Sequence, residues 1–156
     1  MSARRSMFAN RSSRGFTIVE ALVALVVLAV GMLGIASLYV TTLRASGSAA
    51  SRMQAVNLAS DLGDRIRANR TAEAAYAGAA AEDATTCVGD TVNCDDTAMA
   101  AHDLFVWQAA IQAAFPGAPA GTVTVNTVTN PTSYQIRVSW VEAGNLTQSY
   151  TLNLQI

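Results

Sequence analysis

Apolar residues fill one uninterrupted stretch near the start of the chain. No charged residue occurs from Ala21 to Thr42. Within it, the segment from Leu22 to Val40 would span about 28 Å as an α-helix, which is close to the hydrocarbon thickness of a bilayer. We therefore predict a transmembrane segment from Leu22 to Val40, inside a membrane-spanning half helix that covers residues 16–43.

After Arg44 the apolar residues become periodic instead of continuous. They recur every three or four positions with charged residues between them, a spacing that predicts an amphipathic helix: Met53, Val56, Ala59, Leu62 and Ile66. No proline occurs from Met1 to Phe115. We therefore predict one helix from about Thr17 to Asn69. Its second half, residues 44–70, would lie outside the membrane and pack its apolar stripe on a C-terminal sheet.

Residues 71–156 have the pattern of a globular α+β head. A second helix is predicted from about Thr97 to Phe115, with one apolar face formed by Leu104, Trp107, Ile111 and Phe115. Three alternating runs then predict an antiparallel sheet with one buried and one wet face: Gly121–Val128, Tyr134–Trp140 and Tyr150–Ile156. A hairpin signal at residues 142–145 joins the last two runs.

Charge is distributed unevenly, although the formal net charge is only -1. Residues 1–15 contain four arginines and no acidic residue: Arg4, Arg5, Arg11 and Arg14. All eleven acidic residues lie from Phe16 onward, and Glu20 is the first of them. Positive charge before an apolar segment stays on the cytoplasmic side, so the remainder should face outward. Its acidic balance argues against nucleic-acid binding through a broad basic surface, and no nucleic-acid partner is predicted.

The chain has two cysteines, Cys87 and Cys94, and one histidine. Outside the cytoplasm a disulfide between them is predicted, with two free thiols as the alternative. A structural zinc site needs four ligands, which these residue types do not supply here. Carboxylates between Asp90 and Asp96 suggest calcium as one reading, but the EF-hand spacing is absent and Asp95 is typical of a helix N-cap. No metal or cofactor is predicted.

His102 and Asp103 are adjacent at the start of the second helix. A His–Asp pair suggests catalysis, but no nucleophile occurs in a recognisable setting near it in the sequence. We therefore predict a surface histidine and no enzymatic activity.

The junction between the basic leader and the apolar stretch reads Arg14-Gly15-Phe16-Thr17-Ile18-Val19-Glu20. This pattern resembles the type IV prepilin signal. The resemblance implies that residues 1–15 are a leader, cut between Gly15 and Phe16 by a prepilin peptidase that then N-methylates Phe16. It also implies a charge pair between the new amine of Phe16 and Glu20 of a neighbouring subunit, which would favour one axial offset. The simpler alternative is that Glu20 lies at the headgroups, where the helix dipole favours a carboxylate.

Residues Asn57–Arg70 resemble the end of this helix in the PilV group of minor pilins, where the pattern is roughly Ala-Asp-Leu-Ala-Asp-Arg-(apolar)-Arg-Ala-Asn. The chain departs from that pattern at Ser60 and Gly63. The alternative is an ordinary solvated helix face. The resemblance implies the pilin fold, with a long N-terminal helix packed on an antiparallel sheet of about three strands.

The same resemblance implies a minor pilin that takes part in type IV pilus assembly and supports adhesion and twitching motility. It would sit in the bacterial inner membrane with its head in the periplasm, and its partners would be other minor pilins and the major pilin. A minor pseudopilin of a type II secretion system is the nearest alternative. A binding module at a pilus tip is another, but Arg137 is the only basic residue in the sheet region.

Overall fold

The structure is a computed structural model that describes residues 15–78, 81–83, 87–88 and 94–156. Residues 1–14 of the predicted leader, with its four arginines, lie outside the described residues. The chain divides into two compact units, Met1–Arg44 and Ala45–Ile156, which we describe separately.

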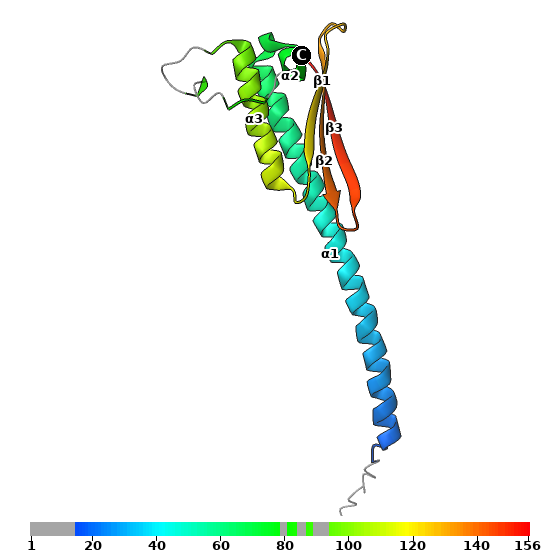
Figure 1. Cartoon of the computed structure of the whole chain (residues 1–156). Coiled ribbons are helices and arrows are strands. Elements are labelled where there is room, and N and C mark those ends of the chain that lie inside the picture. Colours follow the sequence, from blue (N-terminus) through cyan, green and yellow to red (C-terminus); the bar gives the residue numbers. More distant parts are fainter. Residues whose placement is uncertain (1–14, 79–80, 84–86, 89–93) are drawn as a thin grey trace, which may run out of the picture. The chain divides into compact units, whose positions relative to one another are not determined.

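One helix, α1, runs from Ile18 to Ala68 and takes part in both units. It matches the helix predicted from about Thr17 to Asn69, and Figure 1 shows it as the long blue-to-green ribbon. Thr17 lies immediately before its first residue. The Thr17 carbonyl accepts hydrogen bonds from the backbone N–H groups of Glu20 and Ala21, at 3.1 and 3.2 Å.

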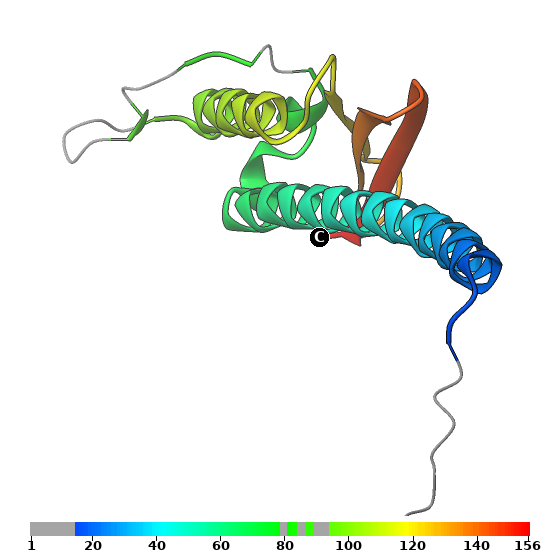
Figure 2. The same cartoon turned by 90° about the horizontal axis from the view of Figure 1, so that it is seen from below.

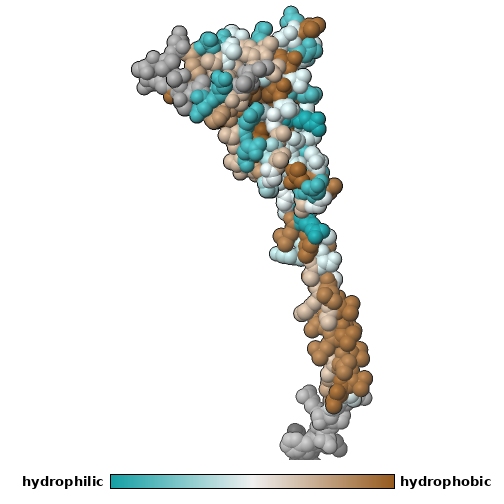
Figure 3. Space-filling model, viewed as in Figure 1, coloured by the Kyte–Doolittle hydropathy of each residue, from teal (hydrophilic) through white to brown (hydrophobic). Residues whose placement is uncertain are grey.

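In the first unit, every described side chain from residue 15 to residue 44 is exposed. Figure 3 shows the corresponding surface as almost uniformly hydrophobic. Among the described residues, α1 is the one helix long and apolar enough to cross a membrane, with a mean hydropathy of 2.7 in its most apolar window. An all-round apolar helix lowers its free energy by exchanging water for lipid.

The second unit packs helices on one face of a sheet. A short 3₁₀ turn, η1 (Arg70–Ala72), and a single helical turn, α2 (Ala75–Gly78), follow α1, and α3 runs from Asp96 to Ala114. Strands β1 (Ala120–Asn126), β2 (Ser133–Glu142) and β3 (Leu146–Gln155) form one antiparallel sheet in the order β1-β2-β3. Figure 2 shows α1 and α3 as separate rods beside the sheet. The predicted α+β fold is confirmed.

The core stripe of α1 differs from the predicted one at its start. Met53 is 65% exposed, and the buried stripe consists of Ala55, Ala59, Leu62 and Ile66. At 3.6 residues per turn, Met53 lies about 160° around the helix from Ala55, so both cannot face the sheet. The prediction was wrong at Met53 because it assumed a spacing of three residues from Met53 to Leu62, whereas an α-helix has 3.6 residues per turn.

The predicted apolar faces of α3 and β2 are confirmed. All their members are buried: Leu104, Trp107, Ile111 and Phe115, followed by Tyr134, Ile136, Val138 and Trp140. The rings of Phe115 and Trp140 stack with centroids 5.3 Å apart, and Trp107 Nε1–H donates to the carbonyl of Leu58 at 2.9 Å. These contacts join the end of α3 to the sheet and its middle to α1.

The hairpin between β2 and β3 forms where it was predicted. Gly144 and Asn145 adopt positive φ angles of 90° and 63°, which glycine and asparagine accept most readily. Close by, Glu142 Oε1 accepts hydrogen bonds from Ser48 Oγ at 2.9 Å and from Trp140 Nε1 at 3.2 Å. The carboxylate thereby ties the hairpin to α1.

Two glycines allow close approach between layers. A Cβ on Gly63 would lie 3.2 Å from Leu154 Cδ1, so the departure from alanine at this position brings β3 nearer to α1. A Cβ on Gly121 would lie 2.5 Å from both Ile111 Cδ1 and Trp107 Cη2. Because both neighbours belong to the buried core, β1 can rest on α3 only with glycine at position 121.

Gly121→Ala should destabilise the second unit by about 1–3 kcal/mol, because the added methyl group overpacks the core. Gly47→Ala is the matched control. Gly47 lies within α1 with open space around it, so the change should be neutral or stabilising by about 0.5–1 kcal/mol. Denaturant unfolding of the full chain in detergent, followed by tryptophan fluorescence, measures both. Equal stability of the two variants would contradict the close packing of β1 on α3.

Candidate processing and assembly site

The predicted cleavage bond lies directly before α1. Gly15, Phe16 and Thr17 precede the first helical residue, have no regular secondary structure and are exposed, with Phe16 at 73%. A peptidase must bind the scissile bond in an extended form, which a helix would prevent. The described part of the predicted site is therefore open, while cleavage and N-methylation themselves stay predictions.

Thr17 and Glu20 form the start of a capping box. Thr17 Oγ1 accepts a hydrogen bond from the backbone N–H of Glu20 at 3.3 Å, and Glu20 lies in the first turn of the helix. A threonine followed three residues later by glutamate is the sequence signature of this cap. The carboxylate is also favoured there by the helix dipole. The local geometry explains why the helix begins at Ile18.

The Glu20 side chain is exposed, and within residues 15–44 no basic group forms an ion pair with it. Its cap bond uses the backbone N–H, so among the described residues both carboxylate oxygens remain open to a cation from another chain. The described part of the site therefore consists of an open bond at Gly15–Phe16 and, one helical turn further on, a carboxylate that has no ion-pair partner among residues 15–44.

A buried carboxylate joins three helices in the second unit. Asp103 of α3 is only 6% exposed. Its Oδ1 accepts from Arg65 Nη1 of α1 at 3.2 Å, and its Oδ2 accepts from the Tyr76 hydroxyl of α2 at 2.8 Å. Arg65 Nε also donates to Asp61 at 3.0 Å. Both oxygens of Asp103 thus have partners, as burial of a charge requires.

The same contacts fix the protonation of the two donors. Burial raises the pKa of Tyr76, and its hydrogen bond to Asp103 raises it further, so the phenol stays neutral and donates. For Arg65, burial lowers the pKa, but the hydrogen bonds to Asp61 and Asp103 outweigh it and the pKa is raised overall. One neutral and one charged donor therefore hold a single carboxylate.

The Asn57–Arg70 segment serves two purposes in the structure. Asp64 and Arg67 form an exposed pair at 2.6 Å, as a solvated helix face would. Arg65 instead faces Asp103, which the solvated-face alternative did not predict. Tyr76 and the role of Asp103 were not predicted from the sequence. The burial of Asp103 could have been predicted from helical spacing, because Asp103 falls between Ala100 and Trp107 on the buried side of α3.

His102 is not the surface residue that was predicted. Its side chain is only 12% exposed, and its Nδ1 is buried without a hydrogen bond, 3.9 Å from Asp83 Oδ1. Successive residues of a helix point about 100° apart, so His102 faces Asp83 while Asp103 faces Arg65. The adjacent pair is therefore not a catalytic dyad.

The two cysteines are joined by a disulfide, Cys87–Cys94. Asp95 is the N-cap of α3 and accepts from the Ala98 N–H at 2.7 Å, which confirms the capping alternative for this carboxylate. Asp90, at the other end of the segment for which calcium binding was considered, lies outside the described residues. In the part of the chain that the structure describes, no group of three metal-ligating side chains occurs.

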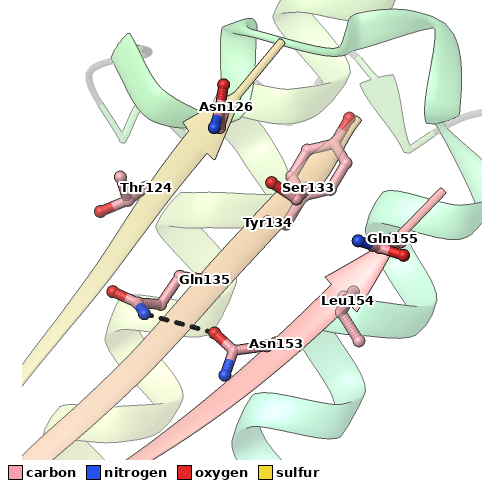
Figure 4. A pocket seen from close by; sticks show the side chains of 8 residues that line it. All are labelled: Thr124, Asn126, Ser133, Tyr134, Gln135, Asn153, Leu154 and Gln155. Atoms are coloured by element: carbon pink, nitrogen blue, oxygen red, sulfur yellow. Dashed lines mark hydrogen bonds between the residues drawn. The ribbon is translucent and has the colours of Figure 1, made fainter. Parts of the chain in front are cut away.

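The outer face of the sheet is polar and nearly uncharged. At one end it carries an open hollow of about 600 Å³, shown in Figure 4, whose polar lining consists of hydroxyl and amide groups. Across its floor, Gln135 Nε2 donates to Asn153 Oδ1 at 3.3 Å. The residues around the hollow are Thr124, Asn126, Ser133, Tyr134, Gln135, Asn153, Leu154 and Gln155. The lining holds no carboxylate, imidazole or thiol.

A long apolar helix packed by its second half on a three-stranded antiparallel sheet defines a pilin-like subunit. Comparison with known families agrees with this class. Residues 10–36 match the prokaryotic N-terminal methylation motif, and residues 37–105 match the family described as type IV pilin Tt1218. The two matches support a type IV pilin. No curated protein and no solved structure matches the chain.

Asp103→Ala should destabilise the head by about 1–3 kcal/mol, because it leaves the Tyr76 hydroxyl and one side of Arg65 without their buried acceptor. Asp64→Ala, which removes an exposed pair with Arg67, should change stability by less than about 0.5 kcal/mol. Chemical unfolding of the two variants in the same detergent compares them. If Asp64→Ala lowered the free energy of unfolding as much as Asp103→Ala, the hydrogen bonds around Asp103 would contribute no more to stability than an exposed ion pair.

Proposed function

We propose that the chain is a minor pilin of the PilV kind, which helps to prime or complete type IV pilus assembly and so supports adhesion and twitching motility. The observation that carries the proposal is the open Gly15–Phe16 bond before a capped, apolar helix whose first turn holds a carboxylate without an ion-pair partner in the described part of the chain. The match of residues 10–36 to the N-terminal methylation motif supports the same role. The work of such a subunit is packing, without catalysis of its own.

The proposed mechanism begins at the inner membrane. The arginine-rich leader keeps the N-terminus cytoplasmic, where a prepilin peptidase cuts after Gly15 and methylates the amine of Phe16. The head then lies in the periplasm, a compartment in which the Cys87–Cys94 disulfide persists.

Assembly follows from the charge that cleavage creates. Glu20 lies at the edge of an apolar helix, where an unpaired charge costs several kcal/mol. The amine of Phe16 on a neighbouring subunit neutralises it only when the two helices have the correct axial offset. The pair therefore selects the register in which this subunit joins other minor pilins and the major pilin.

The finer assignment to the PilV kind rests on the Asn57–Arg70 segment. Its Arg65 holds the buried Asp103 and, through it, Tyr76 of α2. The pattern Asp-Arg-apolar-Arg thus places Arg65 partly buried against the head and Arg67 on its surface. A structural reason of this kind supports the resemblance, because it explains which of the two arginines the head needs.

The class is tested by mass spectrometry of the N-terminal peptide from membranes of cells that make the protein. We expect a mature chain that starts at N-methylated Phe16. An intact Met1, or a cut at another bond, would overturn the proposed processing. The same analysis of sheared pili then asks whether the mature chain is present there. A mature chain confined to membranes, in cells whose pili are abundant, would favour the secretion-system alternative.

Glu20→Ala should leave cleavage largely intact but lower incorporation into sheared pili by about tenfold or more, the effect of losing about 1.4 kcal/mol of docking energy. Glu82→Ala, which removes an exposed carboxylate of the head, is the control and should incorporate normally. Quantitative immunoblotting of pili against membranes gives the ratio. Normal incorporation of the Glu20 variant would show that the carboxylate does not select the register.

A further inference from the structure

The sheet has one long open edge. Strand β3 spans Leu146–Gln155 and pairs with β2 on one side, and the sheet order places no described strand on its other side. Figure 1 shows β3 at the outer side of the sheet, away from α3. Alternate backbone N–H and C=O groups of an edge strand point outward, where they are free to pair with another chain.

Nothing along β3 protects this edge. Native edge strands are usually blocked by lysine, proline, a bulge or a short length. Strand β3 is 10 residues long, has neither charge nor proline, and pairs with β2 without a break in register from Leu146 to Gln155. Its side chains on the outer face are small or amide residues, all exposed: Thr147, Ser149, Thr151, Asn153 and Gln155.

The opposite edge strand differs. Strand β1 has only seven residues, and both α2 and α3 contact it. Its Gly121 is pressed against Ile111 and Trp107 of the core. The two edges therefore share the same polar outer surface, but the longer and more open row of backbone groups belongs to β3.

We propose that the free edge of β3 pairs with an edge strand from the head of a different pilin subunit, so that one sheet continues across two subunits. The proposal rests on the proposed pilus role and adds to it a second contact, far along the chain from Glu20. A row of alternating backbone donors and acceptors is matched best by an extended polypeptide, and uncharged side chains put no like charge against it.

A second copy of this chain is a poorer occupant. Symmetric pairing of β3 with another β3 is antiparallel and requires a two-fold axis across the strands. Subunits that enter one filament through the Phe16–Glu20 register share one direction instead. A strand from a different pilin head meets no such conflict, because its edge runs in whichever direction its own fold provides.

The partner is identified by photo-crosslinking in cells that assemble pili. The full chain carries a benzophenone amino acid at Asn153 of β3 or, as the matched control, at Thr124 of β1. These positions flank Gln135 of β2 from its two sides, and both are exposed. We expect Asn153 to crosslink to a strand of another pilin head, mapped by peptide mass spectrometry, and Thr124 to give no such product.

Blocking the edge is the second measurement. Thr151→Lys places a lysine on β3, and Thr122→Lys places one on β1. Each new lysine lies beside Arg137, so the repulsion within the head is the same in both variants. Thr151→Lys should reduce the Asn153 crosslink and incorporation into sheared pili by about tenfold, whereas Thr122→Lys should change them by less than about twofold. Equal unfolding midpoints of the two purified variants show that both are folded.

The outcomes separate the two proposals. A crosslink from Asn153 to β3 of a second copy, to a protein that is not a pilin, or to nothing would overturn the strand-pairing proposal. So would equal effects of Thr151→Lys and Thr122→Lys. If the unmodified chain is absent from pili, the pilus role fails instead. A crosslink from Asn153 to a pilin head in membranes would then still support pairing, within a related assembly.

Discussion

The whole molecule depends on one helix that satisfies its own backbone hydrogen bonds along two stretches with very different side chains. Because α1 pairs its N–H and C=O groups internally, it needs no partner in lipid and none in the head. What changes along it is the distribution of side chains. Before Arg44 they are apolar on every side, and from Ala55 only a narrow stripe is apolar and buried. The apolar first stretch and the core scaffold are thus one continuous helix.

The head is built on the small residues of that stripe. Ala55, Ala59 and Gly63 let the sheet and α3 lie close to α1, and the bulk of the core comes from the facing elements, above all Trp107 and Trp140. Polar contacts then fix the position of each layer on the helix. Glu142 holds the hairpin to Ser48, and Asp103 holds α3 to Arg65. Packing brings the layers together, and these partly buried hydrogen bonds give them one register.

Periodicity in the sequence predicted each element whose burial has one simple face. The ends of α1 and α3 and the inward residues of β2 follow from spacing alone, and so does the hairpin at residues 142–145. The failures have a common cause. Met53 was placed by local spacing, His102 by its residue type, and Asp103 by its neighbour, whereas each is decided by elements distant in the chain. Tyr76 had no signal at all, because the loop-like segment around it is weakly patterned. The family resemblance helped where the periodicity was silent, at Gly15–Glu20.

The core closes between the first and the last parts of the head to be synthesised. Ser48 and Glu142, whose side chains meet, are 94 positions apart in the chain. The sheet cannot cover the apolar stripe of α1 until β2 and β3 have been synthesised. Contacts between residues so far apart in the chain are also slow to form. Beside Leu62 and Ile66, the alanines and glycine of that stripe present little apolar surface during that interval, and the two tryptophans come later in the chain, on α3 and β2. At these small positions the nascent head therefore exposes less apolar surface before the sheet is made.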